Sequence, residues 1–471
     1  MHFQATTPLL LSLLATLFLT TAAQPVKSAY PEDPAYPETP TYPKDPTYPE
    51  TPAYPKDPTY PETPTYPKDP TYPFFLPPSF WQDPTHHHPL RLSSSDSLTA
   101  CLCDQLVFSL KMYSSTDSTH ELHRPLDGVN PEDRKDAPLG PEGIRWTLAS
   151  GASTETQTYY VALDDGCFFF LQVAYANFGF GPNVQLSYRY YDPKNPSISD
   201  FRSANLSASK FKLSEDNRSF HMNEVSSSTK DGHNFSVLLS FKEKAQFTLT
   251  AETEAFRLGK GRTTFGVGED ASYIAHDWVL QSRSEGIITL KDRSTRSLNG
   301  TATLVHAIQR GRPYALATKW RFAVAYGKRL TCNMISFQTS EKWGSQWVGQ
   351  SGIAIDGKML GATDQVFGEP DGEEEDVVSG YSIPTGQTYW CEGILSDGRP
   401  CKVKFHAPMK QLVERIDLLA QLPWMLRKVI QTFVTRPFLY QWWETVKATI
   451  TLGDEVIEED IQLLQEASFM R

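Results

Sequence analysis

Apolar and polar residues alternate through much of the chain between residues 158 and 452. The run at residues 184–190, VQLSYRY, places every second residue on an apolar face, as in a strand with one buried side. Short turns such as Asp-Asp-Gly at residues 164–166 separate neighbouring runs. The pattern predicts an all-β protein whose antiparallel strands form meanders that close into barrels or sandwiches.

The apolar runs divide into two series. We expect strands at residues 158–163, 167–175, 184–190, 235–241 and 247–251, and then at 286–290, 320–326, 330–337, 347–355, 387–395, 402–406 and 446–452. This length suffices for two domains of ordinary size. We place the first domain at residues 141–272 and the second at 273–455, followed by an acidic tail at 456–471.

Residues 412–442 show a different period. Leu412, Ile416 and Leu419 would share one face of an amphipathic helix. Pro423 suits the first turn of a second helix, which Arg436-Pro437 would end, because a residue before proline is driven out of the helical region. The sequence therefore predicts a helix pair that packs across the second barrel, just before a last strand at residues 446–452.

The amino-terminal region has no globular pattern. Residues 1–23 read as a secretory signal peptide, with an uncleaved interfacial anchor as the alternative. We expect residues 24–140 to be a disordered Tyr-Pro hexapeptide repeat and linker; the prolines of repeats such as TYPKDP favour an extended rod. The repeat is a spacer, or its tyrosines stack on polysaccharide or cross-link into a cell wall. Residues 86–88, three histidines, are solvated or bind a metal.

Charge and motif content exclude several classes of protein. The net charge of -11 and the absence of a basic patch argue against a nucleic-acid partner. The acidic run at residues 368–376 lacks the spacing of a calcium loop and reads as a solvated loop. The sequence holds no recognisable catalytic triad, phosphate loop or zinc spacing, so we predict no catalytic residue, no metal site and no cofactor.

Cysteines and glycosylation signals are compatible with export. Of six cysteines, Cys391 and Cys401 flank a short turn and are the best candidates for a disulfide across a hairpin. Four N-glycosylation sequons occur, at Asn205, Asn217, Asn234 and Asn299. Together with the signal-like start they favour the secretory pathway, and hence an extracellular or cell-wall location.

Several stretches together resemble the fungal survival factor family, oxidative-stress survival proteins with two lipocalin-like domains. The matching stretches are residues 158–161 (TYYV), 172–175 (QVAY), 191–196 (YDPKNP), 268–270 (GED) with His276, 312–322, and 412–417 (LVERID) continuing through Pro423 to 436–441 (RPFLYQ). The resemblance covers about residues 141–455. After His276 the chain departs from the family pattern, with Asp277-Trp278-Val279-Leu280.

The resemblance implies two lipocalin-like barrels that bind or carry an apolar ligand, a ceramide-like sphingolipid, without catalysis. The residues it offers as ligand-cavity candidates are His276, Trp320, Phe322, Arg415 and Tyr440. It also implies an alternative location, cytoplasmic and at the membrane surface, which the signal-like start opposes.

Two other functions stay open. The first is a lipocalin-like hydratase or cyclase of an apolar metabolite, for which His276, Glu414, Arg415 and Asp417 would supply the acid or base. The second is a structural protein of the cell wall, in which the Tyr-Pro repeat is the functional part.

Overall fold

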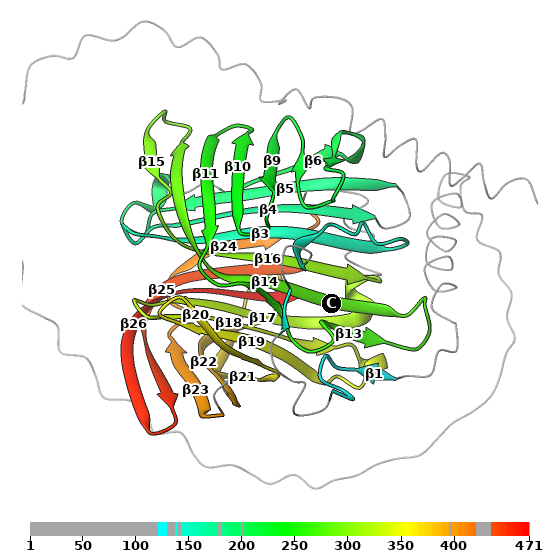
Figure 1. Ribbon diagram of the computed structural model, residues 1–471, viewed down its shortest axis with the longest axis vertical. Helices are drawn as coiled ribbons and strands as arrows, with labels where there is room; N and C mark the ends of the chain where they lie inside the picture. The colour runs from blue at the N-terminus through cyan, green and yellow to red at the C-terminus, as the bar shows by residue number, and fades with distance from the viewer. Residues whose placement is uncertain are drawn as a thin grey trace, which may run out of the picture. The chain divides into compact units, whose positions relative to one another are not determined.

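The computed structural model describes residues 121–129, 137–139, 143–177, 181–198, 201–394, 398–420 and 435–470. These residues form two antiparallel sheets, here called sheet A and sheet B, joined by short turns and a few single-turn helices (Figure 1). The all-β prediction with two β units is therefore confirmed. The predicted signal peptide, the hexapeptide repeat and the three histidines at 86–88 lie outside the described residues.

Sheet A contains sixteen strands between residues 122 and 310. Its main path runs through β6 (Phe201–Ser207), β5 (Pro182–Tyr191), β4 (Phe168–Asn177), β3 (Ser153–Leu163), β16 (Gly300–Arg310), β14 (Ser272–Thr289), β11 (Lys244–Ala251), β10 (Asn234–Ser240), β9 (Val225–Thr229), β8 (Phe220–His221) and β7 (Lys212–Leu213). Shorter strands join it at β1 (Leu122–His123), β2 (Ala137–Pro138), β12 (Ala255–Arg257), β13 (Arg262–Phe265) and β15 (Thr295–Ser297). Single turns η3 (Pro196–Ile198) and η4 (Ala208–Lys210) flank β6.

Sheet B contains ten strands. Its path runs through β20 (Lys358–Thr363), β19 (Trp347–Ile355), β18 (Leu330–Thr339), β17 (Ala317–Tyr326), β26 (Glu455–Phe469), β25 (Phe438–Leu452), β23 (Pro400–Ala407), β22 (Ser382–Ile394) and β21 (Gln365–Glu375), with β24 (Leu412–Asp417) paired to β25. The single turn η5 (Glu341–Trp343) follows β18. The chain passes between the sheets at α3 (Pro313–Leu316), later than the predicted boundary at 272–273, because β14 and β16 pair within sheet A.

The predicted helix pair is wrong in its described part. Residues 412–417 form strand β24, which pairs antiparallel with residues 438–442 of β25. Leu412 is 44% exposed, so the apolar helical face inferred from the sequence is not a buried face. The β ladder supplies the backbone hydrogen bonds that a helix would have made internally. The second predicted helix, with Pro423, falls on residues 421–434, outside the described residues.

The predicted acidic tail is also wrong. Residues 455–469 form β26, which lies between β17 and β25, so residues 446–452 belong to the strand before it. Ile461, Leu463 and Ala467 are buried in sheet B at every second position, while Glu458 is exposed. The alternation buries one face of the strand and leaves Glu458 and Asp460 on the other.

Four apolar clusters hold the described fold together. One lies inside sheet A and one inside sheet B, and the third and the fourth each contain residues of both sheets. On β3, Tyr159 belongs to the first cluster and its neighbour Tyr160 to the third, because successive side chains of a strand point to opposite faces. In the third cluster the ring of Phe168 stacks on that of Trp443 at 4.9 Å between centroids. Contact between the sheets is therefore a packed core.

Candidate functional site

His276, the predicted site histidine, lies buried on β14. Its Nδ1 is 2.8 Å from Nε2 of Gln350 on β19, and its ring packs against Trp278 and Trp320 at centroid distances of 5.9 and 6.1 Å. Burial lowers the pKa of His276 to about 4, so the imidazole is neutral at physiological pH. Its closest partners are an amide and two aromatic rings, which fits a packing role better than acid–base chemistry.

Of two further candidates, Phe322 is a core residue, and Trp320 is partly buried and packs against the core. Phe322 packs between Tyr160 and Trp278, with centroid distances of 5.2 and 6.0 Å. Trp320 packs against Phe337 at 4.7 Å. Together with His276 these side chains fill the contact between sheets A and B.

Arg415 and Tyr440 come together around a residue that the sequence did not single out, Asp376. Arg415 Nη1 lies 2.7 Å from Asp376 Oδ1, and the Tyr440 hydroxyl lies 2.6 Å from both Asp376 Oδ2 and Ser379 Oγ. Burial alone would raise the pKa of Asp376, but hydrogen bonds from Tyr440 and Ser379 outweigh it and lower that pKa to about 2. This network ties β24 and β25 to the turn between β21 and β22.

A cavity of about 510 Å³ opens where β24 meets the end of β5, and we call it the β5–β24 pocket. Its lining residues are Arg189, Tyr191, Pro193, Pro196, Lys410, Gln411, Leu412, Val413 and Glu414. The two stretches that line it, residues 191–196 and 412–417, are among those on which the family resemblance rests. The two stretches were identified separately in the sequence, and in the fold they form two walls of one pocket.

Arg189 holds the two walls together. Its side chain is 4% exposed, and it extends from β5 in sheet A to β24 in sheet B. Nη1 donates to the carbonyl oxygen of Val413 at 2.8 Å, and Nη2 forms an ion pair with Glu414. Because a buried guanidinium is costly without partners, this pairing fixes the position of β24 beside the pocket.

The β5–β24 pocket combines apolar and polar walls. Prolines, Tyr191, Leu412 and Val413 give it apolar surface, while Lys410, Gln411 and the Arg189–Glu414 pair give it hydrogen-bonding groups. Such a mixture suits a molecule with an apolar body and a polar end. The charges of Arg189 and Glu414 offset each other, while Lys410 adds one positive charge to the wall.

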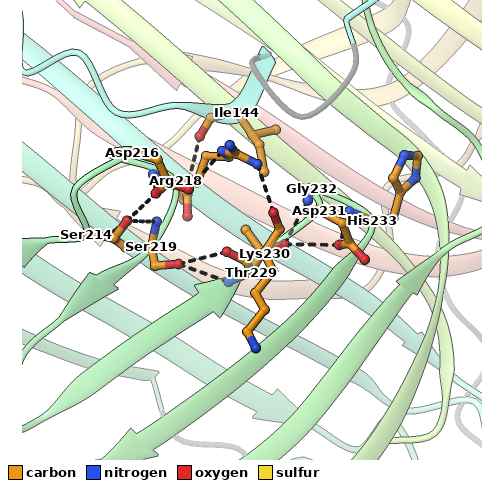
Figure 2. Close-up of polar contacts among 11 residues, drawn as sticks. Ile144, Ser214, Asp216, Arg218, Ser219, Thr229, Lys230, Asp231, Gly232 and His233 are labelled. Carbon is orange, nitrogen blue, oxygen red and sulfur yellow. Dashed lines mark hydrogen bonds and ion pairs between the residues drawn. The ribbon is translucent and has the colours of Figure 1, made fainter.

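A second hollow, about 1020 Å³, lies on sheet A beside residues 214–219 and 228–236. Figure 2 shows how its polar side chains are engaged with one another. Ser219 Oγ bonds to the backbone of Thr229, Arg218 donates to the carbonyl oxygen of Lys230 at 2.9 Å, and Asp231 accepts from the amides of His233 and Asn234. Phe235 and Leu249 add apolar surface to the hydroxyl and carboxylate groups of this hollow.

Inside sheet A lies a carboxylate–histidine pair that the sequence did not reveal. His306 Nε2 is 2.8 Å from Glu155 Oε1, and both side chains are 1% exposed. Glu155 also accepts from the amides of Thr147 and Leu148, at 2.7 and 2.6 Å. In the described part of the chain, His306 Nδ1 has no hydrogen-bond partner. A signal was available, since Glu155 and His306 are polar residues at core-facing positions of apolar strands.

The predicted disulfide between Cys391 and Cys401 does not form, and both thiols are free and buried. In the ladder of β22 and β23, Cys391 is opposite Val403 and Cys401 is opposite Gly393. The two cysteines are thus diagonal neighbours, which lie about 7–8 Å apart across a sheet. Disulfides rarely bridge Cα atoms more than about 7 Å apart.

The four sequons lie on sheet A. Asn205, Asn234 and Asn299 are exposed, whereas Asn217 is half-buried in a turn with a left-handed φ of 59°. Glycosylation at these positions stays a prediction. None of the helices in the described ranges is long and apolar enough to span a bilayer. The same ranges contain no group of three His, Cys, Asp or Glu side chains arranged to hold a metal ion.

Comparison with known proteins gives the following matches. The model of the Svf1 family matches residues 115–471. The ceramide-binding protein svf1 of Schizosaccharomyces pombe is 29% identical over 73% of this chain and 92% of its own, and survival factor 2 of the same organism is 24% identical over 66% and 88%. Kievitone hydratase from Nectria haematococca superposes with a TM-score of 0.43 at 11% identity, over 74% of this chain and 96% of its own.

Proposed function

The chain belongs to the Svf1 family, and from that membership we propose that it binds a ceramide-like lipid without transforming it and thereby supports survival under oxidative stress. The match over residues 115–471 carries the proposal, since it includes both sheets and both walls of the β5–β24 pocket. A relative named for ceramide binding covers most of the same region.

The β5–β24 pocket is the proposed site for the polar end of the lipid. A ceramide has an uncharged head of hydroxyl and amide groups, which both donate and accept hydrogen bonds. Gln411 and Lys410 offer donors, and Glu414, half-exposed beside its partner Arg189, offers an acceptor. Each methylene transferred from water stabilises the complex by about 0.8 kcal/mol, so the acyl chains supply most of the binding free energy.

Leu412 allows a sharp test of this placement. It lines the pocket yet is 44% exposed, so Leu412→Glu adds a charge to the apolar wall without burying it in the core. We expect at least about a tenfold loss of ceramide affinity, because about 1.4 kcal/mol of lost contact is already a factor of ten. Native mass spectrometry with a short-chain ceramide, or a fluorescent ceramide titration, measures the change.

Val456→Glu is the matched control, since Val456 is 62% exposed on β26 of the same sheet and does not line the pocket. Unchanged ceramide affinity is expected for this variant. If Leu412→Glu binds as tightly as Val456→Glu, the lipid lies elsewhere. If neither these variants nor the unaltered protein bind ceramide, the proposed function itself fails.

The location we propose is the secretory pathway, ending outside the cell or in the cell wall, with association at the wall or at a membrane surface. The exposed sequons Asn205, Asn234 and Asn299 support it, since glycan transfer needs accessible asparagines. Digestion of the native protein with an N-glycosidase is expected to increase its electrophoretic mobility, and the triple Asn→Gln variant should abolish that shift. An unshifted native protein would favour the cytoplasmic, membrane-surface alternative.

One observation favours a second function, hydration or cyclisation of an apolar metabolite. The Glu155–His306 pair has the arrangement of a carboxylate that orients an imidazole for proton transfer. Mass analysis of ceramide recovered after incubation separates the two functions. Under the binding proposal the lipid returns unchanged, whereas a gain or loss of water that Glu155→Gln removes would establish the enzyme.

A further inference from the structure

Two cysteines on opposite walls of sheet B lie against each other. Cys332 is on β18 and Cys391 on β22, and four strands separate β18 from β22 in the ladder order. The curvature of the sheet nevertheless brings both thiols to one serine hydroxyl. Ser351 Oγ on β19 lies 3.6 Å from Cys332 Sγ and 3.4 Å from Cys391 Sγ, so a single hydroxyl touches both sulfurs.

Both thiols are held rigidly. Cys332 is 1% exposed and Cys391 is fully buried, and each belongs to the apolar core of sheet B. A side chain buried in a close-packed core keeps one rotamer and the same neighbours. The two sulfurs therefore stay near each other in the folded protein, and their spatial relation does not depend on a flexible loop.

We propose that Cys332 and Cys391 form an oxidisable dithiol, which a peroxide converts to a disulfide that joins the two walls of sheet B. The pairing comes from the Ser351 hydroxyl, which lies within 3.6 Å of both sulfurs. It replaces the pairing of Cys391 with Cys401 that sequence spacing suggested.

The electrostatics of the pair assign the roles of the two sulfurs. The neighbouring Cys332 thiol lowers the pKa of Cys391, while burial raises the pKa of Cys332. Cys391 is thus the sulfur that reaches the thiolate state, which is the nucleophilic form. Its thiolate attacks one oxygen of hydrogen peroxide and releases hydroxide, which leaves a sulfenic acid on Cys391.

In the second step the disulfide bond forms. The sulfur of Cys332 attacks the sulfenic sulfur of Cys391, the S–O bond breaks and water leaves with the thiol proton. Two thiols and one hydrogen peroxide thus give one disulfide and two waters. Both sulfurs are buried, so the oxidant must be small, and a bulky disulfide such as oxidised glutathione cannot reach Cys391 in the folded protein.

The bond would change the mechanics of sheet B. The two end regions of its strand order approach one another, since β19 contacts β21 and β20 contacts β22, but they are not joined by a hydrogen-bonded ladder. A bond between β18 and β22 would close this gap covalently. Cross-linking positions this distant in sequence restricts the unfolded chain, so the oxidised protein is expected to melt about 5 °C or more above the reduced one.

Peptide mapping of the full-length protein tests the proposal. The reduced protein is treated with hydrogen peroxide, its remaining thiols are alkylated, and it is digested without reduction. We expect a cross-linked peptide that contains Cys332 and Cys391, with a mass two hydrogens below the sum of its parts. After the folded protein is treated with oxidised glutathione, Cys332 and Cys391 should still be free thiols. An alkylating reagent should modify them only once the protein is denatured.

Matched variants complete the experiment. Cys332→Ser should abolish both the cross-link and the rise in melting temperature, whereas Cys401→Ser and Cys167→Ser should keep both. Cys167 lies in sheet A and Cys401 lies diagonal to Cys391, so these two control for oxidation of a buried thiol as such. If Cys332→Ser does not fold, peptide mapping of the unaltered protein still tests the proposal. A cross-link from Cys391 to Cys401, or two unbridged thiols after peroxide treatment, overturns the proposal.

Discussion

Glu466 shows how a single carboxyl is affected by the contact between the sheets. It lies on β26, where its Oε1 accepts from Nε2 of Gln441 at 2.6 Å and the Tyr160 hydroxyl of sheet A lies 3.4 Å away. Burial raises the pKa of Glu466 from 4.5 to about 7, and the hydrogen bonds from Gln441 and Tyr160 only partly oppose this rise. The carboxyl is therefore about half protonated near neutral pH.

Stability should consequently depend on pH through this residue. A carboxyl whose pKa is higher in the folded state stabilises the fold below pH 4.5 and loses that stabilisation as the pH rises through about 7. Glu466→Gln is always neutral and should lack this loss. Urea unfolding at pH 5, 6, 7 and 8 is expected to show the unaltered protein falling in stability relative to Glu466→Gln, most steeply between pH 5 and 7 and levelling off by pH 8. Parallel curves for the two proteins would show that Glu466 is solvated.

At the scale of single residues, the sequence predicted site residues only where polar residues belong to a recognisable stretch. Arg415 and Tyr440 were found because they belong to stretches that resemble a family, and the fold does join them. Asp376, their common partner, was hidden in an acidic run that read as solvated loop. Glu155 and His306 are distant in sequence, and only the register of β3 and β16 brings them together.

Among the elements, β24 was the least predictable. Its residues are mostly half-exposed, so neither a helical nor a strand period is clearly imposed by burial. The strand conformation follows from tertiary contacts, namely the ladder with β25, the Arg189 side chain and the Asp376–Arg415 pair. By contrast, β5 and the strands of sheet A around it were predictable, because one of their faces is continuously buried.

The network that anchors β24 can be weakened at Tyr440. Tyr440→Phe removes a buried hydroxyl that donates to Asp376, and we expect a loss of about 1–3 kcal/mol in the free energy of unfolding. The pKa of Asp376 should also rise from about 2 toward its usual value. A carboxyl with a lowered pKa loses its stabilisation as the pH falls, so the variant should unfold at a higher pH during acid titration.

Tyr389→Phe is the control, since Tyr389 is buried in the same sheet and its hydroxyl makes no hydrogen bond among the described residues. Acid titration followed by tryptophan fluorescence measures both variants. The network would not be an anchor if the two variants had the same acid midpoint as the unaltered protein.

On the scale of the whole described fold, the two sheets are joined by apolar clusters, and Trp443 belongs to one of them. Its ring stacks on Phe168 of sheet A, and its Nε1 donates to the carbonyl oxygen of Gly166 at 3.0 Å. The sequence predicted two β units but placed their boundary within sheet A. The reason is that β14 and β16 resemble any other strands, and only long-range pairing with β3 and β11 assigns them.

Trp443→Ala should therefore destabilise both sheets together. We expect a loss of about 3–5 kcal/mol, as for other truncations of buried aromatic side chains. Trp390→Ala serves as the control, because Trp390 is only half-buried and stacks on the exposed Phe367, and its loss should cost about 1 kcal/mol or less. Urea denaturation gives both values, and equal losses in the two variants would contradict a shared core.

The late position of β26 in the sequence has a consequence for synthesis. All strands of sheet A have been translated once residue 310 is reached, whereas β17, at Ala317–Tyr326, needs a partner at Glu455–Phe469. Until the ribosome has released β26, the ladder edges of β17 and β25 that will receive it stay open to other chains. Nascent protein is thus most prone to aggregate in the interval between these two strands, when chaperones that cover strand edges should bind it.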